Sequence, residues 1–280
     1  MIVSEQAPYI QVENLVYQYP DGTVALHGID LAIHHGDFIA LIGQNGSGKT
    51  TLSKCLNGLF KPTQGRVVVD SLDTRTTSIT QMAKRVGYVF QNPDHQLFNS
   101  NVWDEIAYGP RNIQLPEEEV KARVEEAIRV VGLEERYLEQ HPFFLTKGLR
   151  QRVAIGSILA LRPKVIIVDE PTTGQDIKQS LEIMDFLANL HRERGHIIIV
   201  ITHDMPIVAR YAKRTVVLGM GEILADGPTR EVFAQPDVLA KTFVEPPQIT
   251  QLAQVCVDLG FDPGTMTVEE MIVRFRELVS

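Results

Sequence analysis

A glycine-rich segment, GQNGSGKT at residues 43 to 50, carries the clearest chemical pattern in the chain. Gly43, Gly46 and Gly48 let the backbone turn tightly, so that successive N–H groups point inward and form a concave anion site at the start of a helix. Lys49 is placed to reach β- and γ-phosphates, and the hydroxyl of Thr50 to reach Mg²⁺. Because a strand-like run precedes the segment and a helical pattern follows it, we interpret it as a nucleotide phosphate site rather than a flexible loop.

Two neighbouring carboxylates, Asp169 and Glu170, end the apolar run VIIVDE. A buried strand tip is an unfavourable place for paired acids unless a metal or a proton transfer offsets their desolvation. Strand alternation would send the two side chains to opposite sides, so we expect separate roles. We expect Asp169 to support Mg²⁺ and Glu170 to be the general base for hydrolysis. The alternative is a pair of helix-capping acids before Pro171.

Two further polar residues, His203 and Gln91, follow the apolar runs IIIVIT and VGYVF. A histidine in such a place is by itself more often structural than catalytic. Ligands gather at the carboxyl ends of parallel strands, however, which brings both residues toward the nucleotide. We therefore expect His203 to contact the γ-phosphate and Gln91 to reach Mg²⁺ or the attacking water.

The pattern of apolar residues predicts the strands and helices that carry these side chains. The runs FIALIG, RVVVD, RVGYVF, KVIIVDE and HIIIVITH have strand length and are mostly separated by helical patterns or glycine turns. This alternation predicts an α/β core with a largely parallel sheet. Strand-like runs disappear between about residues 92 and 160, where PEEEVKARVEEAIRVVG places its apolar residues on one helical face. We predict a helical insertion there.

The C-terminal part begins with TVVLGMGEILADG, whose Gly219 and Gly221 predict a hairpin. We place the core domain at residues 1–236 and a helical extension at residues 237–280. The extension has two apolar stripes: Ile249, Leu252, Ala253, Cys256 and Leu259, and then Val268, Met271, Ile272 and Phe275. They could pack on the chain's own core or form a partner surface, and the sequence leaves both open.

Composition excludes some classes of protein. The chain has 280 residues of which 44% are apolar, and no run approaches the roughly 18 residues of a membrane-spanning helix. The N-terminus MIVSEQAPYI lacks the basic end and long apolar stretch of a secretory signal, so we expect a cytoplasmic protein. The formal charge of -8 argues against a general nucleic-acid coat, and we expect no nucleic-acid partner.

Six motifs follow one another along the chain: Tyr19, GQNGSGKT, Gln91, LTKGLRQR, VIIVDEPTTGQD and His203. In these motifs and in their order, the chain resembles the nucleotide-binding subunits of ABC (ATP-binding cassette) transporters. The resemblance covers about residues 9 to 230. It implies a P-loop NTPase core of the ABC ATPase type, an antiparallel β subdomain near Tyr19 and an inserted helical subdomain. It also implies that two chains enclose two ATP molecules head to tail, each between one chain's phosphate loop and the other chain's signature turn.

The resemblance assigns roles to individual residues. Tyr19 would stack on adenine, and Glu170, His203 and Gln91 would be catalytic. Mg²⁺ would be held by Thr50, Gln91 and Asp169, and Asp176 would be the D-loop residue. The residues implied to bind ATP are Tyr19, Gly43, Gln44, Asn45, Gly46, Ser47, Gly48, Lys49, Thr50 and Thr51.

Within that family, residues 91 to 110, QNPDHQLFNSNVWDEIAYGP, are similar to the energy-coupling-factor (ECF) group, which drives uptake of vitamins or of cobalt and nickel ions. The tail with PPQIT resembles that group's extension, which contributes to pairing of the ATPases. The resemblance implies a second ABC ATPase chain, an integral membrane scaffold, substrate-binding membrane subunits and a peripheral position on the cytoplasmic face of the membrane. The alternatives are another ABC transporter's ATPase, a soluble ABC protein acting on DNA or ribosomes, and a nucleotide-binding module without hydrolysis.

One place departs from the family pattern. The signature turn, which is implied to act on the partner's ATP, usually has a serine, two glycines and a glutamine; here these positions are Thr146, Lys147, Gly148 and Leu149. Thr146 keeps a hydroxyl, and Lys147 keeps a useful N–H if its φ is negative; a left-handed backbone there would cost about 1–2 kcal/mol. The ammonium could approach the phosphate or point into solvent.

The altered turn stands beside a complete set of residues for the chain's own ATP. We therefore favour a heterodimer with a related ATPase over a homodimer, with one composite site slowed. Gln175, where the family often has leucine before Asp176, is a smaller departure whose effect the sequence does not assign.

Overall fold

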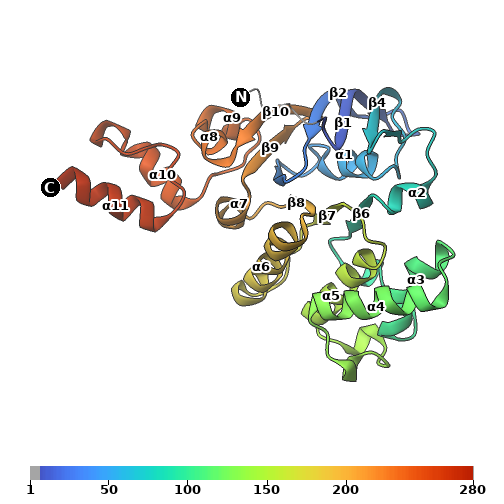
Figure 1. Cartoon of the computed structure of the whole chain (residues 1–280). Coiled ribbons are helices and arrows are strands. Elements are labelled where there is room, and N and C mark those ends of the chain that lie inside the picture. Colours follow the sequence, from blue (N-terminus) through green and yellow to red (C-terminus); the bar gives the residue numbers. More distant parts are fainter. Residues whose placement is uncertain (1–6, 280) are drawn as a thin grey trace, which may run out of the picture.

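The computed structural model describes residues 7–279, which form two β-sheets surrounded by helices (Figure 1). The first sheet is antiparallel, with strand order β2-β1-β4-β5. Its strands are β1 Ile10–Gln18, β2 Val24–Ile33, β4 Gln64–Val69 and β5 Leu72–Asp73. Tyr19 follows β1 directly, so the antiparallel subdomain lies where the family resemblance implies it.

The second sheet has the order β10-β9-β3-β8-β7-β6, and all its neighbouring strands are parallel except the edge strand β10. Every residue of β3, β6, β7 and β8 is buried, which explains why the sequence shows continuous apolar runs there. The strands are β3 Phe38–Ile42, β6 Val86–Val89, β7 Val165–Asp169, β8 Ile197–Ile201, β9 Arg214–Gly219 and β10 Glu222–Pro228.

The run RVVVD differs from the other four apolar runs, because it belongs to β4 of the antiparallel sheet and not to the parallel one. In its last residues it alternates: Val67 and Val69 are buried, whereas Val68 is partly exposed. This pattern is typical of a sheet with one covered face, and three consecutive valines concealed it. The hairpin prediction is confirmed: β9 and β10 join at Met220 and Gly221, with φ 47° and 78° as a type I′ turn requires.

The stretch from 92 to 160 contains helices and no strand. Its main helices are α3 Val102–Asn112, α4 Glu117–Val131 and α5 Lys147–Leu159, with short turns η1 Pro93–His95, η2 Glu135–Tyr137 and η3 Pro142–Phe144. The predicted apolar face of α4 is buried along its whole length, namely Val120, Val124, Ala127, Ile128 and Val131. The helix ends at Gly132, whose φ of 66° is left-handed.

The parallel sheet separates two hydrophobic clusters. Alternate residues of β8 enter opposite clusters: Ile198 and Val200 pack with the helical insertion and α6, while Ile199 and Ile201 pack with the antiparallel sheet and α1. The helices outside the insertion are α1 Lys49–Leu56, α2 Ile79–Ala83, α6 Ile177–Arg194, α7 Met205–Tyr211 and α8 Thr229–Phe233. None of the helices within residues 7–279 is long and apolar enough to cross a membrane.

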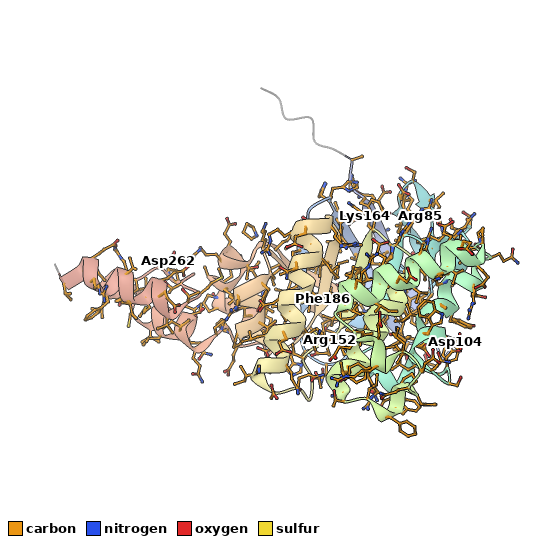
Figure 2. All side chains as sticks on the ribbon, turned by 60° about the horizontal axis from the view of Figure 1, so that its bottom comes forward. Arg85, Asp104, Arg152, Lys164, Phe186 and Asp262 are labelled. Carbon is orange, nitrogen blue, oxygen red and sulfur yellow. The ribbon has the colours of Figure 1, made fainter. Side chains whose placement is uncertain are left out.

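The C-terminal extension comprises α9 Pro236–Ala240, α10 Gln248–Val255, η4 Val257–Leu259 and α11 Val268–Val279. It projects from the opposite end of the molecule to the helical insertion, as the positions of Asp262 and Asp104 in Figure 2 show. Arg230 of α8 holds it by donating to Glu270 Oε1 at 2.5 Å and to the carbonyl of Gly264 at 3.1 Å.

Burial of the two apolar stripes in the extension indicates whether they pack on the chain's own core or remain available to a partner. Ala253 is fully buried, but α11 has no buried residue, and Val268, Ile272 and Phe275 are each about half exposed. The α11 stripe therefore does not pack on the chain's own core. The division at residues 236 and 237 stays a prediction, and the outermost residues of the two predicted domains, 1–6 and 280, lie outside the described part of the chain.

Candidate functional site

A cleft of about 1150 Å³ lies where the phosphate loop meets the carboxyl ends of the parallel strands. It brings together thirteen of the predicted residues: Tyr19, Gly43, Gln44, Asn45, Gly46, Gly48, Lys49, Thr50, Thr51, Gln91, Asp169, Glu170 and His203. Ser47 is buried under the loop instead, at 1% exposure. Thr146, Lys147, Gly148 and Asp176 do not line the cleft.

The phosphate loop has the backbone that only glycine adopts easily. Gly43 and Gly48 have φ of 145° and 103°, and an added Cβ on Gly43 would lie 2.0 Å from the carbonyl oxygen of Leu218. Gly48 leads into α1 without a side-chain cap, so the N–H groups of the first turn remain available to an anion. The loop therefore fits a phosphate group.

Lys49 supplies a buried positive charge to this loop. Its ammonium donates to the carbonyls of Gly43 and Gln44 at 2.7 and 2.8 Å, which leaves a third N–H donor for a ligand. Burial lowers the pKa of Lys49, and the negative charges of Glu170 and Asp169 partly offset this effect. Within the described residues Lys49 forms no ion pair, so a bound phosphate would supply the missing negative charge.

Asp169 is held by two hydroxyl groups. Tyr88 donates to its Oδ2 at 2.6 Å, and the hydroxyl of Thr50 lies 3.5 Å from the same oxygen. Burial, together with the hydrogen bond and charge of Asp169, raises the pKa of Tyr88, so the phenol stays a neutral donor. Tyr88 was not predicted from the sequence. The available signal was a tyrosine inside VGYVF, whose strand pairs directly with VIIVD.

The donors around Asp169 fit Mg²⁺, a hard cation that prefers oxygen ligands and keeps several waters. Thr50 and Asp169 provide a hydroxyl and a carboxylate, and Gln91 lines the same cleft. In the described part of the chain no cluster of three His, Cys, Asp or Glu side chains could hold a metal ion. Mg²⁺ bound through one or two protein groups keeps phosphate oxygens and water as its other ligands.

Glu170 leaves the strand in a left-handed conformation, with φ of 48°, and its N–H donates to the carbonyl of Ile201 at 2.8 Å. The prediction that strand alternation separates Asp169 from Glu170 is therefore wrong, because both carboxylates line one cleft. Their partners nevertheless differ. The Nδ1 of His203 lies 2.9 Å from a Glu170 carboxylate oxygen, and the hydroxyl of Thr173 donates to Glu170 Oε2 at 3.3 Å.

Tyr19 lies half-buried at the other end of the cleft. Its hydroxyl lies 2.8 Å from that of Thr51, and its ring makes edge contacts with Tyr17 and Phe60, with centroids 5.1 and 5.9 Å away. These contacts fix the ring in place. Stacking of adenine on this ring stays a prediction.

The signature turn begins α5. Thr146 is its N-cap and accepts a hydrogen bond from the N–H of Leu149 at 3.4 Å. Lys147 is the first helical residue and does not have a positive φ, so the strain that a left-handed backbone would bring is absent. Its ammonium takes neither of the two expected directions, because it donates to the carbonyl of Thr173 in its own chain at 2.6 Å.

The loop between β7 and α6 ends at Asp176, which caps α6 by accepting from the N–H of Gln179 at 2.8 Å. Both polar atoms of the Gln175 side chain are buried without a hydrogen-bond partner among the described residues. An unpaired buried amide is destabilising. The unpaired amide therefore predicts a cost in the stability of the chain.

Comparison with known proteins identifies a family that this chain matches. The family described as ABC transporter matches residues 26–173. The energy-coupling factor transporter ATP-binding protein EcfA2 of Caldanaerobacter subterraneus subsp. tengcongensis is 41% identical over 93% of this chain and 94% of its own length.

Two solved structures are also similar. The structure of cbiO1 from Clostridium perfringens, described as part of the ABC transporter complex cbiONQ, has a TM-score of 0.76 and 38% identity over 88% of this chain and 99% of its own. The ATP-binding cassette MJ0796, in a dimeric post-hydrolysis state with ADP and Pi, has a TM-score of 0.70 and 29% identity over 78% of this chain and 98% of its own.

Some relatives are longer than this chain. It spans 43% to 45% of the length of the first three curated relatives it matches, which are described as putative ABC transporter ATP-binding proteins. The EcfA2 protein, in contrast, is matched over nearly its whole length. The chain therefore belongs to the ABC transporter family, and energy-coupling factor transporter ATP-binding proteins are among its relatives.

Proposed function

We propose that this chain is the ATP-binding and hydrolysing energy-coupling subunit of an ECF-type ABC importer, which drives uptake of a vitamin or a transition-metal ion through membrane partners. The observation that carries this proposal is the single cleft in which the phosphate loop, Asp169, Glu170, His203 and Gln91 meet. The similarity to EcfA2 and to cbiO1 supports the ECF assignment.

Each group in the cleft has a task that its contacts suit. The loop N–H groups and Lys49 would bind the phosphates, and Asp169, Thr50 and Gln91 would hold Mg²⁺. When bound, Mg²⁺ neutralises charge on the β- and γ-phosphate oxygens. Glu170 would accept a proton from the attacking water. His203 orients the Glu170 carboxylate and would face the γ-phosphate.

The cleft needs a second cassette, because this chain's own signature turn lies outside it. Thr146 is exposed, and the N–H groups of Lys147 and Gly148 belong to a first helical turn, where no intrahelical acceptor exists. These are the donors that a partner's γ-phosphate requires. We propose a related but different ATPase as the partner, with the exposed α11 stripe contributing to the contact.

The membrane subunits would contact the helical insertion. Phe98 and Phe144 are 63% and 84% exposed, and Phe98 packs edge-on against Tyr108 with ring centroids 4.8 Å apart. These exposed aromatic side chains are the surface that the proposal assigns to the membrane subunits. In this proposal the chain lies at the cytoplasmic face of the membrane, and the membrane subunits select the solute.

The test is affinity purification of the tagged chain from detergent-solubilised membranes, followed by measurement of phosphate release. We expect co-purification of a second ATPase and membrane proteins, with phosphate release that depends on Mg²⁺. Recovery with ribosomes or DNA, or tight ATP binding without phosphate release by the complex, would contradict the proposal.

The heterodimer has its own test. Glu170→Gln and the equivalent change in the second ATPase are made separately in the purified complex, and ATP turnover is measured. We expect unequal losses, because the two composite sites have different signature turns. Equal losses would count against this asymmetry.

A further inference from the structure

Lys147 occupies an unusual position for a charged side chain. It starts α5, whose first turn would face the second cassette in the proposed complex, yet its ammonium is directed back into its own chain and donates to the carbonyl of Thr173 at 2.6 Å. The side chain is partly buried, and among the described residues it has no ion-pair partner. The carbonyl of Thr173 is therefore the acceptor that holds this charge.

The backbone beside Thr173 is shaped to receive the ammonium. Gly174 has a φ of 70°, and an added Cβ there would lie 2.5 Å from the Lys147 Nζ. Any larger residue at 174 would displace the ammonium as well as strain the backbone. The ammonium of Lys147 therefore lies directly against the backbone of the loop after β7.

Thr173 is joined in turn to the proposed general base. Its hydroxyl donates to Glu170 Oε2 at 3.3 Å, and its N–H donates to the carbonyl of Glu170 at 3.2 Å. The other contact of the carboxylate is His203 Nδ1 at 2.9 Å. A continuous set of contacts therefore runs from Lys147 through Thr173 to Glu170 and His203.

This support matters because Glu170 is held in a left-handed conformation, with φ of 48°, that a non-glycine residue adopts only when its surroundings fix it. Thr173 bonds Glu170 at both backbone and side chain, so any shift of Thr173 changes where the carboxylate points. Lys147 restrains the carbonyl of that same residue. The ammonium thereby limits the freedom of the carboxylate.

We propose that Lys147 is a positioning residue for this chain's own ATP site: through Thr173 it holds Glu170 in place, while the partner's ATP receives only backbone and Thr146 donors from the same turn. The inference rests on the proposed ATP hydrolysis. In this proposal the Lys147 side chain serves this chain's own ATP site, and the backbone of the same turn serves the partner's ATP.

The experiment isolates each site within the two-cassette complex. In the first assembly the second cassette carries glutamine in place of its catalytic glutamate, so that only this chain's Glu170 can act. Here Lys147→Met should lower kcat by about three- to tenfold. This is the loss in rate expected when the single hydrogen bond that positions Thr173 is removed. KM for ATP should stay unchanged, and Lys147→Arg, which keeps an N–H donor, should restore most of the rate.

The second assembly reverses the arrangement: this chain carries Glu170→Gln and the second cassette is intact. Lys147→Met should then leave turnover within about twofold of its parent. Lys121→Met, which removes an exposed ammonium from α4, is the matched control in both assemblies. A double variant tests the route: in a Thr173→Val background, Lys147→Met should cause little further loss in the first assembly.

The outcomes separate the two proposals. A complex that releases no phosphate before any substitution contradicts the proposed function. A wild-type complex that hydrolyses ATP, with kcat in the first assembly unaffected by Lys147→Met, overturns only the positioning role. A loss confined to the second assembly would also overturn it, because the ammonium would then serve the partner's ATP. Equal melting temperatures of wild type and Lys147→Met exclude misfolding as the cause of any loss.

Discussion

Single residues in the cleft are held by contacts that do not require a bound nucleotide. Asp169 already receives the phenol of Tyr88, Lys49 is bound to two carbonyls, and Glu170 is fixed by His203 and Thr173. Such preorganised groups need little rearrangement when charge develops during reaction. The functional consequences of these contacts can be tested one side chain at a time.

Tyr88→Phe tests the support of Asp169. The change removes the donor at 2.6 Å from a carboxylate that is 8% exposed, and leaves the ring in place. With less restraint on Asp169, the Mg²⁺ concentration for half-maximal ATP turnover should rise by about tenfold or more, since a hydrogen bond to a charged group contributes about 1.5–3 kcal/mol. Magnesium titration of the turnover rate provides the measurement.

The matched control is Tyr137→Phe, which removes a phenol that accepts from Arg136 in the helical insertion, outside the cleft. It should leave the magnesium titration unchanged. An unchanged titration for Tyr88→Phe would show that Asp169 needs no support from the phenol.

Gln175→Leu tests the unpaired amide beside Asp176. Both polar atoms of Gln175 are buried without a partner among the described residues, a condition that costs about 1–3 kcal/mol. Replacement by the similarly sized leucine should raise the free energy of unfolding by about 1 kcal/mol and the melting temperature by about 2–4 °C. Differential scanning calorimetry measures both.

Gln179→Leu is the control for this change, because its side chain is exposed and only its backbone N–H caps α6. Its effect should stay within about 0.5 kcal/mol. A lower melting temperature for Gln175→Leu would mean that the amide is stabilising where it stands.

At the scale of elements, the helical insertion is tied to the core by ion pairs between helices. Glu126 of α4 receives Arg162, which follows α5, at 2.7 Å and Arg194, at the end of α6, at 2.9 Å. A second link joins Arg152 of α5 to Glu182 of α6 at 3.6 Å, and Figure 2 marks this side of the molecule by Arg152 and Phe186. The insertion is thus held to α6 at two points.

Glu126→Gln tests this tie. The hydrogen bond from Arg162 is the largest cause that lowers the pKa of Glu126 from its usual 4.5; burial opposes it and Arg194 adds to it. The ionised form is thus favoured in the folded protein. Its stabilising effect is complete above the unfolded pKa and is lost as the pH falls through the lower folded pKa.

Because these side chains are about one third to one half exposed, Glu126→Gln should lower the free energy of unfolding at pH 7 by about 0.5–1 kcal/mol. The difference from wild type should shrink as the pH falls below about 4.5. Urea unfolding over this pH range measures it, with Glu125→Gln, an exposed neighbour on α4, as the control. A difference that does not depend on pH would contradict the ion-pair account.

The sequence predicted most elements because their periodicity reflects burial. The parallel strands are buried on both faces and read as apolar runs, and α4 has one apolar face. The location of β4 was not predicted, because three consecutive valines look alike in a sheet with one covered face and in a sheet with two. Periodicity reports how much a strand is buried, and not which sheet it joins.

Some residues of the site could be predicted from the sequence, whereas others could not. The phosphate loop and the strand-end carboxylates were predicted because each depends on a short segment and its flanking elements. The bonds from Tyr88 to Asp169 and from Lys147 to Thr173 were not, because they join positions 81 and 26 residues apart in the chain. The left-handed backbone of Glu170 was missed because the strand pattern continues up to the residue before it.

At the scale of the whole molecule, the cleft and the signature turn are separate surfaces, so the account requires two cassettes for one reaction. Helix α11 and the helical insertion lie at opposite ends of the molecule (Figure 1). Each has exposed apolar side chains, so partners of different kinds could bind at the same time. In the proposed complex, the extension would join the second ATPase and the insertion would join the membrane scaffold.

The most direct test of the central claim is ATP turnover by the purified membrane complex with and without Glu170→Gln in this chain, with the second ATPase's own glutamate replaced in both samples. We expect Glu170→Gln to lower the remaining turnover by about a hundredfold or more, because loss of the general base removes that contribution to the rate, while ATP affinity is preserved. Turnover that persists at the parent rate would contradict the claim that this cleft hydrolyses ATP.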